Sequence, residues 1–159
     1  MRNDAEFNTL ARRFQDDIFR LALGYLKSHD AADDVTQEVL IALYQSNTVF
    51  ENDQHAKNWL MKVTVNECRK IWRRPWRFHE DIDDYAESVF REQTDYSDLF
   101  AAIMNLEKKK RITVILYYVE GYSLAEIAEL TGTPKATVGT RLARARAELK
   151  DLLKEEISV

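Results

Sequence analysis

The residues best suited to chemistry lie near the end of the chain, on a predicted helix that begins at Pro134. Lysine and arginine side chains neutralise phosphates, and arginine and threonine side chains can also reach base edges in the major groove of DNA. The side chains of this helix expected to face a nucleic acid are Lys135, Thr137, Thr140, Arg141 and Arg144. The spacing therefore predicts a DNA-binding helix.

The segment before this helix has the local signals of a helix-turn-helix. Ser123 and Glu126 are spaced as a capping box, in which each side chain accepts the other residue's backbone N–H. Gly132 stands where the first helix must end in a left-handed conformation. Thr133 is then expected to be the N-cap of the next helix and Pro134 its first residue.

Small and apolar residues in the same segment fit two helices that cross at a steep angle. Ala128 allows a close approach, Val138 fills the crossing, and the shared core is completed by Ile127, Leu130 and Leu142. The alternative is a plain helical hairpin with a basic solvent face. The helix-turn-helix is favoured because the caps, the spacing and the basic face occur together.

A second basic segment, residues 57–77, holds seven basic side chains and one acidic one. The residues expected to neutralise a nucleic-acid backbone are Lys62, Arg69, Lys70, Arg73, Arg74 and Arg77. Trp72 and Trp76 alternate with them and could stack on unpaired bases. For Trp72, a position in the protein core remains the alternative.

Acidic segments flank these basic ones, so the formal net charge is only −4. Residues 1–56 hold ten acidic and five basic side chains, and residues 78–105 hold eight and one. Because a local basic field rather than the total charge attracts phosphates, the acidic balance does not exclude a nucleic-acid partner.

The residue types and their spacing do not indicate a metal site or an enzyme active site. His29, His55 and His79 are far apart, Cys68 is the only cysteine, and there is no glycine-rich phosphate loop. We expect no cofactor, no metal, no small-molecule substrate and no enzymatic activity. The lone cysteine and the lack of a long apolar run or a signal-peptide core predict a cytoplasmic protein.

The elements that must position these side chains are all helical. Apolar residues recur at helical spacing, and glycine and proline are scarce. We expect a first helix near 5–27 and a second that is capped by Asp30 and ends near residue 45. Further helices are expected near 55–74, 99–106, 109–119, 123–131 and 134–155. The third should bury Trp59, Leu60, Val63 and Ile71. Two small domains, 1–78 and 99–159, are expected on either side of an acidic linker, 79–98.

Two motif sets in order resemble a known family. Ala32-Asp33-Asp34-Val35-Thr36-Gln37-Glu38-Val39, then Asn58-Trp59-Leu60 and Val65-Asn66 with a basic run, look like region 2 of the extracytoplasmic-function (ECF, group IV) sigma factors. Val119-Glu-Gly-Tyr-Ser-Leu-Ala-Glu-Ile-Ala-Glu and the segment from Thr131 to Leu149 resemble region 4. The resemblance covers nearly the whole chain.

The resemblance implies a role for each matching position. Asp34, Gln37 and Glu38 would dock on the clamp helices of core RNA polymerase; a solvated helix face is the alternative. The residues that would hold the melted minus-10 strand are Phe50, Asn58, Lys62, Asn66, Arg69, Lys70, Arg73 and Arg74. Phe50 could instead fold onto the core, and Asn66 could be a plain exposed helix residue. Ser123 and the helix from Pro134 would contact the minus-35 element.

The implied function is promoter recognition for a polymerase that does the chemistry. The implied partners are core RNA polymerase, promoter DNA and an anti-sigma factor, which is often held at the membrane. A polymerase-independent helix-turn-helix regulator is the alternative. One departure is Gly139, where the family commonly has Lys or Arg. A glycine inside a helix costs roughly 1 kcal/mol relative to alanine, and here it also removes a DNA contact.

Overall fold

A computed structural model gives the fold and describes residues 1–73 and 97–157. The described residues form helices and no β-strand, which confirms the all-α class. The chain divides into two units, Met1–Asp81 and Ile82–Val159. No helix in the described ranges is long and apolar enough to cross a membrane.

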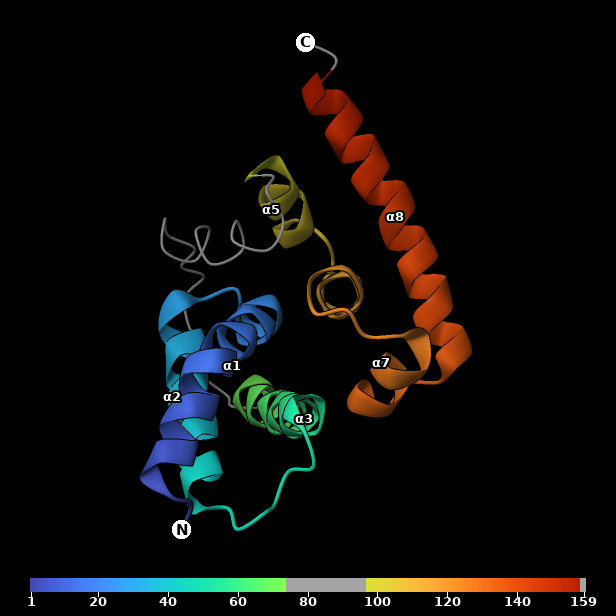
Figure 1. The fold of residues 1–159 in the computed structure, drawn as a ribbon. Coiled ribbons are helices and arrows are strands. Elements are labelled where there is room, and N and C mark those ends of the chain that lie inside the picture. The colour runs from blue at the N-terminus through green and yellow to red at the C-terminus, as the bar shows by residue number, and fades with distance from the viewer. Residues whose placement is uncertain (74–96, 158–159) are drawn as a thin grey trace. The chain divides into compact units, whose positions relative to one another are not determined.

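The first unit contains α1 (Asp4–Leu26), α2 (His29–Gln45) and α3 (Asp53–Trp72). α1 packs against both α2 and α3, and these two helices also contact each other (Figure 1). The side chains at the centre of this packing are fully buried: Ile18, Leu21, Leu23, Val39, Leu43, Leu60 and Met61. Burial of such side chains is the main force that holds the three helices together.

Asparagine and serine caps fix the starts of these helices. Ser28, and not Asp30 as expected, is the N-cap of α2, because its side chain accepts the N–H of Ala31. Asp30 lies in the first turn instead, where the helix dipole still favours an acid. The Asn52 side chain accepts the N–H of His55, so α3 begins at Asp53.

The buried face of α3 is rotated from the expected one. Trp59, Val63 and Ile71 are only half-buried, which corrects the prediction, whereas Leu60 is buried as expected. The buried residues of α3 are Ala56, Leu60, Met61, Thr64, Val65 and Cys68. Small residues at two of these positions let α3 approach its neighbours closely, and the large Trp59 ring lies at the edge of the core.

The second unit contains α5 (Ser97–Met104), α6 (Lys108–Val114), the π-helix η1 (Ile115–Val119), α7 (Leu124–Thr131) and α8 (Lys135–Ile157). The long helix α8 packs against α5, α6 and α7 (Figure 1). A single α-helix over 109–119 was expected. Its last part is a π-helix instead, closed by the N–H of Glu120 donating to the Ile115 carbonyl over 2.9 Å.

Candidate nucleic-acid interface

The acidic face of α2, defined as Asp34, Gln37 and Glu38, is exposed to solvent. Val35 and Val39 on the opposite side of the helix are 1% and 0% exposed, so packing of these two valines holds the face outward. Residues three and four apart on a helix are neighbours, and the three polar side chains therefore form one patch.

The basic face of α3 runs along the whole helix. Its members are Asn58, Lys62, Asn66, Arg69, Lys70 and Arg73. They recur at intervals of about four residues, which places them on one side of the helix, opposite the buried positions. Asn58 and Arg69 are half-buried, and the other four are exposed. Arg74 lies outside the described residues.

Asn58 and Lys70 are among the members of the basic face that already have polar partners. The Asn58 Oδ1 accepts a hydrogen bond of 2.8 Å from Gln54 Nε2, and Lys70 Nζ lies 2.9 Å from Glu67 Oε1. Both pairs lie on the exposed surface, where such interactions are weak and easily exchanged for a phosphate.

Trp72 ties the end of α3 to α1. Its indole Nε1 donates a hydrogen bond of 2.8 Å to the carbonyl oxygen of Tyr25, and the ring is half-buried. Burial, with a smaller contribution from Cys68, raises the pKa of Tyr25 to about 12. Of the two roles left open for Trp72, packing against the protein is the one it has here.

The loop between α2 and α3 places Phe50 against the protein. The Phe50 ring is half-buried and meets the rings of His55 and Trp59 edge-on, at centroid distances of 5.3 and 5.8 Å. The Arg2 guanidinium lies 4.8 Å from the ring centre. This is the folded-back alternative, whereas the neighbouring Val49 side chain is 84% exposed.

Sequence reasoning missed Arg2 and Val49. Arg2 is far from the loop in the chain, so no local spacing could point to it. Val49 carried a weak signal, as an apolar residue among polar ones in a predicted loop.

The second unit has the expected helix-turn-helix geometry. Ser123 Oγ accepts the N–H of Glu126, and Glu126 Oε1 accepts the N–H of Ser123, which confirms the capping box. Gly132 has a left-handed backbone, φ 65°, as expected. Val138 and Ile127 are each 1% exposed between the helices.

The start of α8 differs from the expectation by one residue. The helix begins at Lys135, and its first hydrogen bond runs from the N–H of Val138 to the carbonyl of Pro134. The Thr133 hydroxyl lies 3.0 Å from the Thr131 hydroxyl at the end of α7. Pro134 therefore takes the cap position, for which it needs no backbone N–H.

The recognition face of α8 is defined as Thr137, Thr140, Arg141 and Arg144. These residues are spaced three, four and seven apart, so they share one side of the helix. Thr140 and Arg144 are exposed, and Thr137 and Arg141 are half-buried. Lys135 is exposed too, but it is two residues before Thr137 and lies on a different side, at the first turn.

Gly139 lies close to the first helix of the motif. A Cβ atom at this position would lie 3.9 Å from Leu124 Cδ1 in α7, an ordinary contact distance. A longer side chain would therefore start beside α7, next to the cap at Ser123. No group of histidine, cysteine and acidic residues in the described part of the chain is placed to hold a metal ion.

Comparisons with known proteins agree with this division into two units. The family profile "Sigma-70 region 2" matches residues 10–78, and the profile "Sigma-70, region 4" matches residues 97–149. The chain is 31% identical to the ECF RNA polymerase sigma factor SigM of Mycobacterium tuberculosis, over 92% of this chain and 76% of the relative. It is 32% identical to the RNA polymerase sigma factor SigV of Bacillus subtilis, over 89% and 88%.

Two solved structures have the same fold. One is the sigma factor RpoE in complex with the anti-sigma factor NepR from Bartonella quintana, with a TM-score of 0.68 and 23% identity over 94% of this chain and 97% of that one. The other is CnrH in complex with the cytosolic domain of CnrY, with a TM-score of 0.67 and 24% identity over 96% and 90%. From the profiles and the relatives together, the chain belongs to the ECF RNA polymerase sigma factors.

Proposed function

We propose that this sigma factor brings core RNA polymerase to promoters through three surfaces: the acidic face of α2, the basic face of α3 and the recognition face of α8. The observation that carries the proposal is that each polar face lies opposite a buried apolar stripe of the same helix. Packing thus turns all three faces toward solvent, where a partner can reach them.

The acidic face of α2 is the proposed contact with core polymerase. Asp34 and Glu38 are exposed carboxylates one helical turn apart, so they suit a basic or amide-rich partner surface. The basic face of α3 is the proposed contact with the minus-10 strand. There Asn66 is an exposed amide able to read a base edge, and Lys62, Lys70 and Arg73 neutralise phosphates.

The recognition face of α8, with Lys135 and the cap residue Ser123, is the proposed contact with the minus-35 element. Threonine and arginine side chains at intervals of three and four on one helix fit the major groove. Residues 1–78 and 99–159 would act as the two DNA-binding domains, with 79–98 as the acidic linker.

The remaining parts of the proposal follow from the family. The protein would be a group IV sigma factor that acts in the cytoplasm without enzymatic activity or cofactor of its own. The solved relatives bound to NepR and CnrY support a further partner, an anti-sigma factor.

The test is reconstitution of the full chain with core polymerase on promoters mapped from transcription starts after overexpression. We expect core-dependent initiation at these promoters. Binding of an operator as a dimer without core, together with no affinity for core, would instead support a free-standing regulator.

The proposed polymerase contact has a sharper test in a charge-reversal pair. Asp34→Lys with Glu38→Lys should weaken core binding about 100-fold, because like charges that meet across an interface cost several kcal/mol. Asp16→Lys with Asp33→Lys changes the net charge equally and spares the acidic face, so it is the matched control. Equal affinities of the two double variants for core would contradict the assignment.

A further inference from the structure

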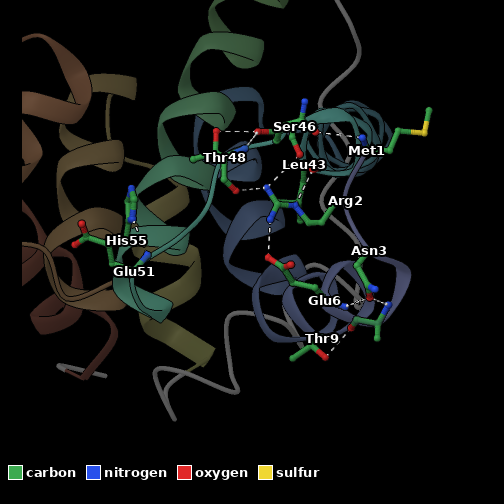
Figure 2. Close-up of polar contacts among 12 residues, drawn as sticks. Met1, Arg2, Asn3, Glu6, Thr9, Leu43, Ser46, Thr48, Glu51 and His55 are labelled. Atoms are coloured by element: carbon green, nitrogen blue, oxygen red, sulfur yellow. Dashed lines mark hydrogen bonds and ion pairs between the residues drawn. The ribbon is translucent and has the colours of Figure 1, made fainter.

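Arg2 joins the end of α2 to the loop that leads to α3. Its Nε donates to the carbonyl of Leu43 over 3.1 Å, and its Nη2 donates to the carbonyls of Ser46, at 3.4 Å, and Thr48, at 2.8 Å (Figure 2). Its Nη1 lies 2.6 Å from the Glu6 carboxylate. The Arg2 side chain is 4% exposed and that of Glu6 is 51% exposed, so the guanidinium is buried while the carboxylate reaches solvent.

The Arg2 guanidinium lies at the C-terminal end of α2, and this position favours a positive charge. The last turn of α2, residues 42–45, has no basic side chain of its own, although the carbonyls at a helix end favour a cation. Arg2 supplies that cation from another segment. The backbone N–H of Arg2 also donates to the carbonyl of Tyr44 over 2.9 Å, so main chain and side chain hold the same turn.

The loop has further contacts besides those with Arg2. Ser46 Oγ accepts the N–H of Thr48 over 3.1 Å, and the N–H of Glu51 donates to Nδ1 of His55 over 3.1 Å (Figure 2). Between these two points the Phe50 ring is held under the Arg2 guanidinium. Val49, adjacent to Phe50, points to solvent and is 84% exposed.

We propose that Arg2 is a positioning residue for promoter recognition: it fixes the loop 46–52 in the conformation that presents Val49 and the neighbouring backbone to the minus-10 DNA strand. The inference rests on the proposed function. A rigid loop next to the basic face of α3 would favour one base over the others, because its shape is set before the strand arrives.

Only arginine fits this role. The three carbonyls and the carboxylate lie around a planar fork, which a lysine ammonium cannot span from one point. Arg2→Lys keeps the charge and loses the geometry, so it separates positioning from electrostatics. Arg13→Lys is the matched control, since Arg13 is an exposed α1 residue that pairs with Asp53 across the surface.

The experiment uses the full chain bound to core polymerase. Open-complex formation is measured on a mapped promoter and on its single-base variants across the minus-10 element, and each variant's rate is divided by that of the parent promoter. This discrimination ratio does not depend on the fraction of protein that is folded. A role limited to stability would leave it unchanged.

We expect Arg2→Lys to reduce discrimination about tenfold at one or more minus-10 positions, with core affinity within about twofold of the parent. Ser46→Ala, which removes the acceptor for Thr48 N–H, should also reduce discrimination, but more weakly. This variant replaces Arg2→Lys in the experiment if Arg2→Lys folds poorly. In the free protein, both variants should speed amide hydrogen exchange in residues 46–52.

Discrimination ratios for both variants within about twofold of the parent at every minus-10 position would overturn the inference and leave the proposed function intact. The same holds if Arg13→Lys reduces discrimination as much as Arg2→Lys. If the parent protein itself gives no core-dependent initiation, the proposed function fails and this inference fails with it.

Discussion

The indole Nε1 of Trp72 donates a hydrogen bond of 2.8 Å to the carbonyl oxygen of Tyr25, at the end of α1. The last carbonyls of a helix have no partner within the helix, so an indole from α3 satisfies a group that would otherwise face the edge of the core. The same contact holds the last turn of α3, which carries Arg69 and Lys70, against the body of the first unit.

Tyr25 should make the first unit sensitive to alkaline pH. Burial raises its pKa from 10.0 to about 12 in the folded state. The folded protein therefore binds the phenolic proton more tightly than the unfolded chain does. The resulting stability is fully present below pH 10 and is lost as the pH rises toward 12, at roughly 1.4 kcal/mol per pH unit.

Tyr25→Phe tests this prediction, because it keeps the buried ring and removes the titrating hydroxyl. The measurement is the urea unfolding free energy of each protein between pH 9 and 12. The difference between the parent and Tyr25→Phe should be constant up to about pH 10 and then shift in favour of the variant. A difference that stays flat to pH 12 would rule out the raised pKa.

Lys27 ends α1 in a conformation that suits glycine. Its φ is +50°, in the left-handed region, and its N–H donates to the Leu23 carbonyl over 2.8 Å. The steric cost of this conformation is about 1–2 kcal/mol for a residue with a Cβ, partly offset by the greater flexibility of glycine in the unfolded chain.

Lys27→Gly should therefore stabilise the first unit by about 0.5 kcal/mol, measured as an increase in the midpoint of urea unfolding. Arg12→Gly, in the exposed middle of α1, is the control and should destabilise by about 1 kcal/mol. Loss of stability in both variants would mean that the interactions of the Lys27 side chain, and not its backbone conformation, decide the outcome.

Local sequence signals predicted the turn of the helix-turn-helix but did not predict the contacts of Arg2. Ser123, Glu126 and Gly132 act within one turn of each other, so their spacing alone predicted the capping box and the left-handed turn. Arg2 and Thr48 meet only after α1 and α2 have packed, and no spacing rule covers a contact 46 residues apart.

The side of α3 that is buried also could not be predicted from local spacing. The helical period predicted a buried side with Trp59, Leu60, Val63 and Ile71, but only Leu60 of these four is buried. The buried side includes Met61 and Cys68 instead, because the side of α3 that is buried depends on how α1 and α2 pack against it, which the sequence of α3 alone does not give.

Gly132 and Gly139 should respond in opposite ways to alanine. At Gly139 a Cβ would meet only Leu124 Cδ1 at 3.9 Å, inside a helix, so Gly139→Ala should stabilise the second unit by about 1 kcal/mol. At Gly132 φ is +65°, so Gly132→Ala should destabilise it by about 1 kcal/mol.

The midpoint of thermal unfolding of the two variants measures this contrast. For a unit of this size, 1 kcal/mol corresponds to a change of roughly 4–8 °C. A decrease for Gly139→Ala would show that α8 must approach α7 more closely than the 3.9 Å contact allows.

A comparison of Arg144 with Arg146 tests whether α8 binds DNA through its recognition face or through its overall positive charge. Both are exposed arginines of the same helix, two residues apart. Arg144 belongs to the recognition face, whereas the Arg146 guanidinium lies over the rings of Tyr117 and Tyr118, at 5.5 and 5.4 Å from their centres, and donates to the Tyr118 hydroxyl. The tyrosines thus hold Arg146 on the side of α8 that packs against its own unit.

Arg144→Ala should weaken binding of the polymerase complex to promoter DNA about tenfold, since a base or phosphate contact of this kind contributes about 1–3 kcal/mol. Arg146→Ala should leave binding within about twofold. The affinities are measured over a series of salt concentrations, and a lower salt slope for Arg144→Ala, by about one, would identify its contact as a phosphate. Equal losses in both variants would mean that α8 attracts DNA through its overall charge, with no defined recognition face.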